Sequence, residues 1–186
     1  SVTLTGRCIT KHMASKVNEI VAGKYDHKGE SVVYGDTDSV YFTAHKTLKK
    51  EIDQGIIPWT KDSVVALYDK ISDEVNGSFK TFMTKAFHTP STRGEVIAAG
   101  RELVASKGLF ITKKRYAVLY YDKEGTRTDV EGKEGKMKAM GLDLKRSDTP
   151  VFVQDFLSDL LYMVLTGNTE QQVLEKISEF RAEFKA

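Results

Sequence analysis

Apolar residues recur every three or four positions in several stretches of the chain, which is the spacing of one face of an α-helix. The stretches cover about residues 4–22, 61–87, 150–166 and 170–184. Threonines that could act as N-caps stand at or near their starts, at Thr3, Thr60, Thr149 and Thr169, and Gly23 and Gly167 follow two of the ends. The pattern therefore predicts four amphipathic helices, of which the last two are close enough in sequence to form a helical hairpin.

Between the helices lie runs rich in β-branched and aromatic residues, which are typical of strands. Residues 31–34 and 39–43 flank Gly35-Asp36-Thr37-Asp38 and predict a β-hairpin with acidic residues at its tip. Residues 95–105 and 109–122 are expected to form a second antiparallel pair that turns at 106–108, and residues 136–142 a short further strand. The order of elements predicts an α+β fold, with an antiparallel sheet packed on two long helices and a C-terminal helical hairpin.

Composition narrows the class of protein without indicating a function. The 186 residues carry 28 basic and 26 acidic side chains, so the formal net charge of +2 gives no general preference for nucleic acid. A single cysteine, Cys8, excludes an internal disulfide and suits a reducing compartment. No apolar run has the length of a membrane span and no signal peptide pattern opens the chain. Because the first residue is Ser1, at the start of a predicted helix, we expect a fragment, excised or naturally split, although removal of a tag would look the same.

The acidic tip of the first hairpin is the first candidate for chemistry. In a nearly extended backbone, Asp36 and Asp38 would project to one face while Thr37 points away. Neighbouring carboxylates repel each other, and a cation between them relieves the repulsion. Mg²⁺ suits such a pair because it takes hard oxygen ligands and keeps open positions for water and substrate phosphates. The alternative is a purely local role, since glycine and aspartate are common turn residues.

Two short motifs extend these observations. Tyr34 to Ser39 resembles the Y-x-D-T-D-S signature of family B DNA polymerases, a palm motif that carries a catalytic metal ligand. Lys113-Lys114-Arg115-Tyr116-Ala117 resembles another palm motif of that family, whose basic residues hold the primer–template. In a strand, Lys114 and Tyr116 would share one side and Lys113 and Arg115 the other. Taken alone, the basic run is better explained as a solvated sheet face, because runs of charge usually are.

The resemblance implies a role for each residue. Asp38 would be a direct metal ligand, and Asp36 a catalytic neighbour that tunes coordination or contacts a metal ion intermittently. Lys114 and Tyr116 would grip the duplex near the primer terminus, with Lys113 and Arg115 nearby on phosphates. Glu95, in the stretch 93–97, is a candidate third carboxylate near the metals. The chemistry would be phosphoryl transfer with two Mg²⁺ ions.

The resemblance also indicates which part of a polymerase is present. Residues 113–150 are most similar to polymerases of the T-even-like tailed phages, and residues 141–150 look like the passage from palm to thumb. We therefore expect the C-terminal part of a palm in residues 1–146 and the start of a thumb in residues 147–186. The family's other metal-binding aspartate, in a D-x-x-S-L-Y-P motif, its fingers helix and its exonuclease domain have no counterpart in this sequence.

This division implies a fragment of a replicative DNA-directed DNA polymerase that is inactive alone. Its partners would be primer–template DNA, a deoxynucleoside triphosphate and the remainder of the enzyme, in the cytoplasm of a bacterial host and away from membranes. One alternative is a non-catalytic DNA-binding module that retains the palm scaffold. Another is a different two-metal enzyme on a palm-like sheet, such as a nucleotidyl cyclase, but this would not explain the run from Lys113 to Tyr116.

Overall fold

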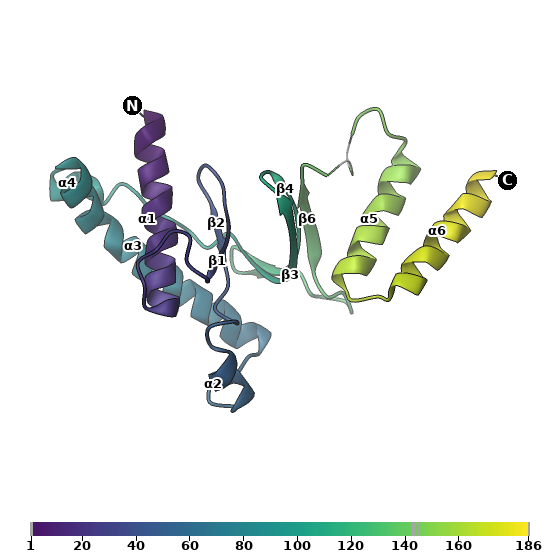
Figure 1. The fold of residues 1–186 in the computed structure, drawn as a ribbon, viewed down its shortest axis with the longest axis horizontal. Coiled ribbons are helices and arrows are strands. Elements are labelled where there is room, and N and C mark those ends of the chain that lie inside the picture. Colours follow the sequence, from purple (N-terminus) through teal and green to yellow (C-terminus); the bar gives the residue numbers. More distant parts are fainter. Residues whose placement is uncertain (1, 143, 145, 186) are drawn as a thin grey trace. The chain divides into compact units, whose positions relative to one another are not determined.

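The structure is a computed structural model that describes residues 2–142, 144 and 146–185. The chain forms two compact units, Ser1–Arg101 and Glu102–Ala186 (Figure 1). Helices and antiparallel strands occur in both units, so the predicted α+β class is confirmed. The antiparallel strands form two sheets, one of two strands in the first unit and one of four in the second.

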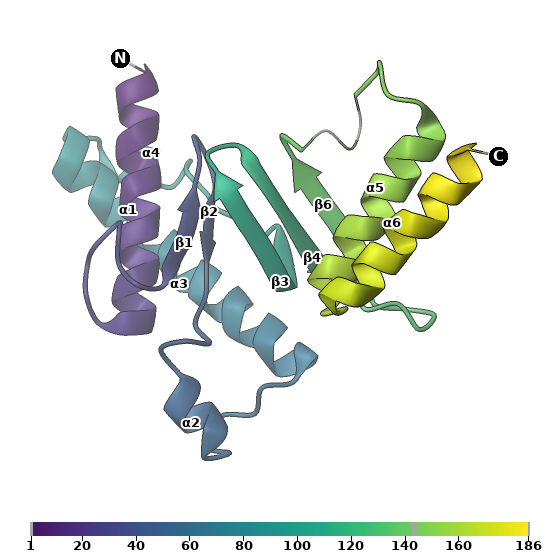
Figure 2. The same ribbon diagram turned by 45° about the vertical axis from the view of Figure 1, so that its right-hand side comes forward.

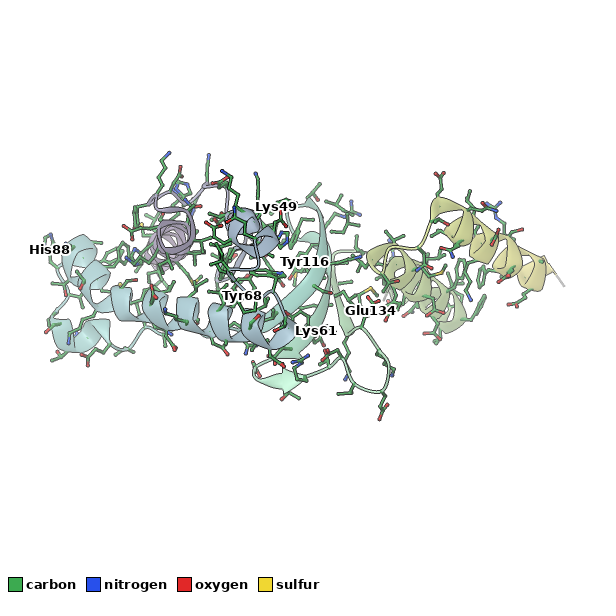
Figure 3. The ribbon with its side chains drawn as sticks, turned by 90° about the horizontal axis from the view of Figure 1, so that it is seen from below. Lys49, Lys61, Tyr68, His88, Tyr116 and Glu134 are labelled. Carbon is green, nitrogen blue, oxygen red and sulfur yellow. The ribbon has the colours of Figure 1, made fainter. Side chains whose placement is uncertain are left out.

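The first unit is built on two helices that cross. Its elements are α1 (Val2–Ala22), β1 (Val32–Gly35), β2 (Val40–Phe42), α2 (Lys49–Asp53), α3 (Lys61–Phe87) and α4 (Ser91–Gly94). Figure 3 looks along the axis of α1 while α3 runs across the view. The core between them consists of Val17 from α1 and Ile71, Val75 and Phe79 from α3. The short helices α2 and α4 were not predicted, because neither is long enough to show a period.

The long helix α3 has the bounds that its apolar stripe predicted. Thr60 Oγ1 accepts a hydrogen bond from the backbone N–H of Ser63, and the Ser63 hydroxyl accepts one from the N–H of Thr60, so a capping box starts the helix. His88, in the left-handed conformation with φ of 52°, ends it. In contrast, α1 begins at Val2. Thr3 therefore lies inside the helix, and the prediction that it is the N-cap was wrong.

Ring stacking and hydrogen bonds of His12 join α1 to α3 and to Tyr25 in the loop that follows α1. The imidazole stacks on Phe82 with ring centroids 4.0 Å apart. Its Nε2 lies 2.8 Å from Ser78 Oγ, and its Nδ1 lies 2.7 Å from the hydroxyl of Tyr25. Ser78 Oγ donates its hydrogen to the carbonyl of Val75, so His12 must donate from Nε2 and accept at Nδ1. Burial lowers the pKa of His12, which favours the neutral imidazole that this hydrogen-bond pattern requires.

After a turn at Glu95 and Val96, residues 97–101 belong to no helix or strand and lie along α3 in place of the predicted first part of a strand. The side-chain amide of Asn76 donates to the carbonyl of Ala99 and accepts from its N–H. Arg101 makes an ion pair with Asp69, with 2.6 Å between Nε and Oδ1. Side chains of α3 thus make the hydrogen bonds and the ion pair that a neighbouring strand would otherwise make with this segment.

The second unit is a sheet covered by a helix. Its elements are β3 (Leu103–Thr112), β4 (Arg115–Lys123), β5 (Thr126–Arg127), β6 (Lys136–Met140), α5 (Val151–Leu165) and α6 (Glu170–Lys185) (Figure 2). Strand β4 pairs antiparallel with β3 along one edge and with β6 and β5 along the other. Its buried residues Ala117 and Leu119 pack with Leu165 of α5.

The turn of the second hairpin is not where the sequence predicted it. Strand β3 continues through 106–108, with Lys107 paired to Leu119 and Gly108 to Val118. The chain reverses at Lys113 and Lys114, and Lys114 adopts a positive φ of 62°. The prediction of a turn at 106–108 was wrong because Ser-Lys-Gly has typical turn composition, whereas the two lysines stand between strongly β-forming neighbours.

The predicted C-terminal helical hairpin is present. Thr169 Oγ1 accepts from the N–H of Gln172, so Thr169 caps α6 as expected. At the start of α5 the N-cap is Pro150 and not Thr149. Phe156 of α5 and Phe180 of α6 stack with centroids 3.8 Å apart, which joins the two helices. No helix within the described residues is long and apolar enough to span a membrane.

Candidate functional site

The first hairpin presents its acidic residues in a turn that is closed by backbone bonding. Gly35 pairs with Val40, and the N–H of Asp36 donates to the carbonyl of Ser39 at 2.9 Å. The predicted hairpin is therefore present, but residues 36–39 lie outside its strands. Strand alternation does not extend to the tip, so the prediction that both acids share a face of an extended backbone loses its premise.

The carboxylate of Asp36 is engaged in the turn itself. Asp36 Oδ1 accepts from the backbone N–H of Thr37 at 2.8 Å, and Thr37 Oγ1 lies 3.3 Å from the same oxygen. The side chain is half-buried. Asp36 thus holds the peptide that follows it, which is a structural role at the tip of the hairpin.

Asp38 differs from Asp36 in its exposure and in its hydrogen bonding. Its side chain is exposed, and within the described residues its carboxylate has neither a hydrogen-bond nor an ion-pair partner. An exposed carboxylate on a fixed turn is a suitable ligand for Mg²⁺, which needs few protein oxygens when substrate phosphates supply others. Over the described part of the chain, no group of three His, Cys, Asp or Glu side chains could hold a metal ion. The described residues therefore form no complete metal site of their own, and the metal role of Asp38 stays a prediction.

Helix α1 holds the hairpin at its base and at its tip. At the base, Asn18 Oδ1 accepts from the N–H of Ser31 at 3.1 Å, and Asn18 Nδ2 donates to the carbonyl of Lys24 at 2.7 Å. At the tip, Thr10 Oγ1 donates to the carbonyl of Thr37 at 2.8 Å. In Figure 1 the hairpin lies beside α1. Neither Thr10 nor Asn18 was identified from the sequence, since one polar residue in a helix carries no signal of a partner far along the chain.

Glu95 lies at the end of α4 and is exposed. Its carboxylate makes an ion pair with the ammonium group of Lys80 on α3, and this hydrogen bond lowers the pKa of Glu95. The backbone can come close to α3 here because Gly94 has no Cβ; one would lie 3.1 Å from the Cα of Lys80. No contact within the described residues joins Glu95 to Asp36 or Asp38, so its metal role remains a prediction from the resemblance.

The basic motif forms a turn and the start of a strand in the second unit. Lys113 and Lys114 make the turn, and Arg115 opens β4. The predicted alternation of these cations along a strand is therefore wrong. Lys113 is exposed and has no hydrogen-bond or ion-pair partner in the described part of the chain, whereas Arg115 Nε donates to the carbonyl of Gly141 at 3.1 Å.

Gly141 fits closely against this basic turn. A Cβ at Gly141 would collide with the carbonyl oxygen of Lys114, and the residue has φ of 65°. The end of β6 thus supports the turn from one side. Gly141 opens the predicted palm-to-thumb passage, of which Asp143 and Lys145 lie outside the described residues.

Tyr116 is placed differently from what a DNA-gripping residue would suggest. Its side chain is only 4% exposed, and its ring stacks with Phe110 of β3 at 5.7 Å. Figure 3 labels it in the sheet of the second unit. Tyr116 therefore braces the hairpin behind the basic turn.

The two motifs lie in a chain with clear relatives. The family model for DNA polymerase family B matches residues 92–185, half of the chain. The chain is also 32% identical over 177 residues to the DNA-directed DNA polymerase of Escherichia phage RB69, an alignment that covers 89% of this chain. The chain belongs to DNA polymerase family B. This confirms the family that the motifs predicted.

Two other DNA polymerases align over most of this segment. The DNA-directed DNA polymerase of Enterobacteria phage T4 is 26% identical over the whole chain, and DNA polymerase 037L of Invertebrate iridescent virus 6 is 27% identical over 91% of it. The chain spans about a fifth of the length of the two phage polymerases, 19% of one and 21% of the other. Its likeness to T-even phage polymerases is thus shown.

Proposed function

We propose that this family B segment forms the C-terminal part of the palm and the start of the thumb of a replicative DNA polymerase. In this role it takes part in adding deoxynucleotides to a primer 3′ end. The observation that carries the proposal is the Asp38 carboxylate, exposed and unpartnered within the described residues, on a turn that α1 and the hairpin backbone hold in place. In this proposal the palm ends at residue 146 and the thumb begins at residue 147.

The residues of the first unit divide the work at the metal site. Asp38 offers its oxygens as ligands, while Asp36 shapes the turn through its bond to the N–H of Thr37. Two Mg²⁺ ions held there would supply positive charge that favours ionisation of the primer hydroxyl and stabilises the triphosphate. The remaining ligands come from the rest of the polymerase, because Mg²⁺ needs six oxygens and this segment supplies at most a few.

The basic turn of the second unit contacts primer–template DNA in this proposal. Lys113 reaches phosphates, since its exposed ammonium has no acid partner among the described residues. Lys114 and Arg115 lie beside it, on a turn that Gly141 and Tyr116 support. The likeness to phage polymerases favours action in the cytoplasm of a bacterial host, alongside the other half of the palm, the fingers and the exonuclease domain.

The proposal predicts that the 186-residue chain alone does not extend a primer, whereas the complete polymerase that contains it does. Primer extension with Mg²⁺ and all four deoxynucleotides measures both. Mg²⁺ binding to the isolated chain should be weak, because the ion keeps most of its water when few carboxylates are offered. Extension by the isolated chain above the level of its Asp38→Ala variant would contradict the proposal. A complete protein that binds primer–template but never extends it would favour the non-catalytic alternative.

A second prediction concerns the salt dependence of DNA binding. Lys113→Ala in the complete polymerase should flatten the plot of log affinity against log salt by about 0.9, the contribution of one phosphate contact on B-form DNA. The control is Lys133→Ala, which removes another exposed lysine from the loop before β6, at the opposite end of the strands from the turn. That change should leave the slope unaltered.

The neighbouring cations serve as a further comparison in the same salt titration. Arg115→Ala should also flatten the slope, while Lys114→Ala should weaken binding with less change in slope if it contacts base edges. Thermal stability is measured in parallel, since Arg115 bonds to Gly141 and its loss could loosen the turn. Unchanged affinity in all of these variants would assign the motif a purely structural role.

A further inference from the structure

The backbone on both sides of Thr37 is held by side chains. The peptide between Asp36 and Thr37 is fixed through its N–H, which donates to Asp36 Oδ1 at 2.8 Å. The peptide between Thr37 and Asp38 is fixed through its carbonyl, which accepts from Thr10 Oγ1 at 2.8 Å. Because a peptide unit is planar, fixing this carbonyl also restricts the Cα of Asp38, which lies in the same plane.

The group that holds the second peptide comes from a well-supported helix. Thr10 lies on α1, two residues before His12, and α1 is packed on α3 through Val17 and through the stacking and hydrogen bonds of His12. The carbonyl of Gly6, one turn earlier in the helix, lies 3.0 Å from the same hydroxyl and competes for its single hydrogen, and the shorter 2.8 Å distance favours donation to Thr37. The contact of Thr10 with Thr37 thus links a rigid element to the residue that precedes Asp38.

The rest of the turn offers little else to restrain Asp38. The backbone bond from Asp36 to Ser39 closes the hairpin, but the Asp38 carboxylate has no partner of its own within the described residues. When the backbone of a metal-binding residue must become ordered before the residue binds its ion, the affinity for the ion falls because the ordering costs entropy. The contact with Thr10 removes part of this cost in advance.

We propose that Thr10 is a positioning residue that presets the Asp38 turn for divalent cations through its hydrogen bond to the carbonyl of Thr37. The inference rests on the proposed function of Asp38 as a metal ligand. Loss of the Thr10 hydroxyl should weaken cation binding at the turn by between about twofold and tenfold, the range of one net hydrogen bond. Affinity for DNA should not change, because Thr10 itself contacts neither DNA nor metal in this scheme.

The experiment uses the complete polymerase and three variants. Thr10→Val keeps the shape of the side chain and removes the hydroxyl, and Thr10→Ser restores the hydroxyl. Thr3→Val makes the same chemical change at an exposed position of α1 whose hydroxyl has no partner among the described residues. Mn²⁺ binding is measured by electron paramagnetic resonance, and the Mg²⁺ concentration for half-maximal primer extension is measured alongside thermal stability.

The expected result is weaker Mn²⁺ binding and a raised Mg²⁺ requirement for Thr10→Val, with values near wild type for Thr10→Ser and Thr3→Val. Rescue by serine separates positioning from a general loss of packing. Unchanged Mn²⁺ binding in Thr10→Val would overturn the inference, as would an equal loss in Thr10→Ser. Asp38→Ala, run in parallel, distinguishes the two failures. If it too leaves Mn²⁺ binding and extension unchanged, the proposed function fails; if it removes them, only the role of Thr10 fails.

Discussion

Replacing Asp38 with asparagine should lower primer extension by the complete polymerase by a factor on the order of 1,000. A ligand to a catalytic ion contributes several kcal/mol to transition-state stabilisation, and about 1.4 kcal/mol corresponds to tenfold in rate. Asparagine keeps the size of the side chain but removes its charge. Because Asp38 is exposed and makes no internal bond among the described residues, the variant should fold as well as the wild type. The loss is therefore expected in the rate of extension at saturating DNA and nucleotide.

Asp36→Asn is the matched control for this change, since it removes the same charge two residues earlier. An asparagine oxygen at position 36 can still accept from the N–H of Thr37, so the turn keeps its shape. We expect a loss of about tenfold or less, in line with an indirect role. Equal losses in the two variants, at unchanged thermal stability, would contradict the division of roles between Asp36 and Asp38.

Truncation of Phe79 to alanine should lower the free energy of unfolding by about 4 kcal/mol, the range found for phenylalanine in a packed core. Phe79 is 1% exposed and belongs to the cluster formed by α1 and α3. Urea unfolding of the 186-residue chain, followed by circular dichroism, measures the change. Phe184→Ala removes the same ring at a position that is 70% exposed and should cost less than about 1 kcal/mol.

The effect of Phe79 extends beyond stability. Its ring lies 5.8 Å from the imidazole of His12, on the helix that also carries Thr10. A cavity at Phe79 would therefore weaken the packing of α1 on α3, and with it the support that α1 gives to the Asp38 turn. If Phe79→Ala and Phe184→Ala destabilised the chain equally, this description of the core would be wrong.

The sequence predicted best where local signals agreed. The bounds of α3 followed from an apolar stripe that a Thr60 cap preceded, and the first hairpin followed from β-forming runs around Gly-Asp-Thr-Asp. The turn at Lys113 and Lys114 was missed because lysine is no typical turn residue and only the sheet register shows the reversal. Sequence alternation then assigned these cations to strand faces that do not exist.

The bonds that support the candidate site could not have been predicted from the sequence. Thr10 is 27 residues from Thr37, and Arg115 is 26 residues from Gly141. Such contacts depend on how helices and strands are placed in space, and no local pattern encodes them. Asp38 was identified because it lies in a recognisable motif, whereas Thr10 belongs to none.

The pairing of Asn76 with Ala99 bears on the exposure of backbone groups to other chains. An extended segment with unpaired N–H and C=O groups is a template on which another chain can add a strand. The amide of Asn76 occupies both backbone groups of Ala99, so α3 covers part of an edge that residues 97–101 would otherwise present. In an Asn76→Leu variant these groups would be open to a neighbouring molecule, and concentration-dependent association would follow from a change inside a helix.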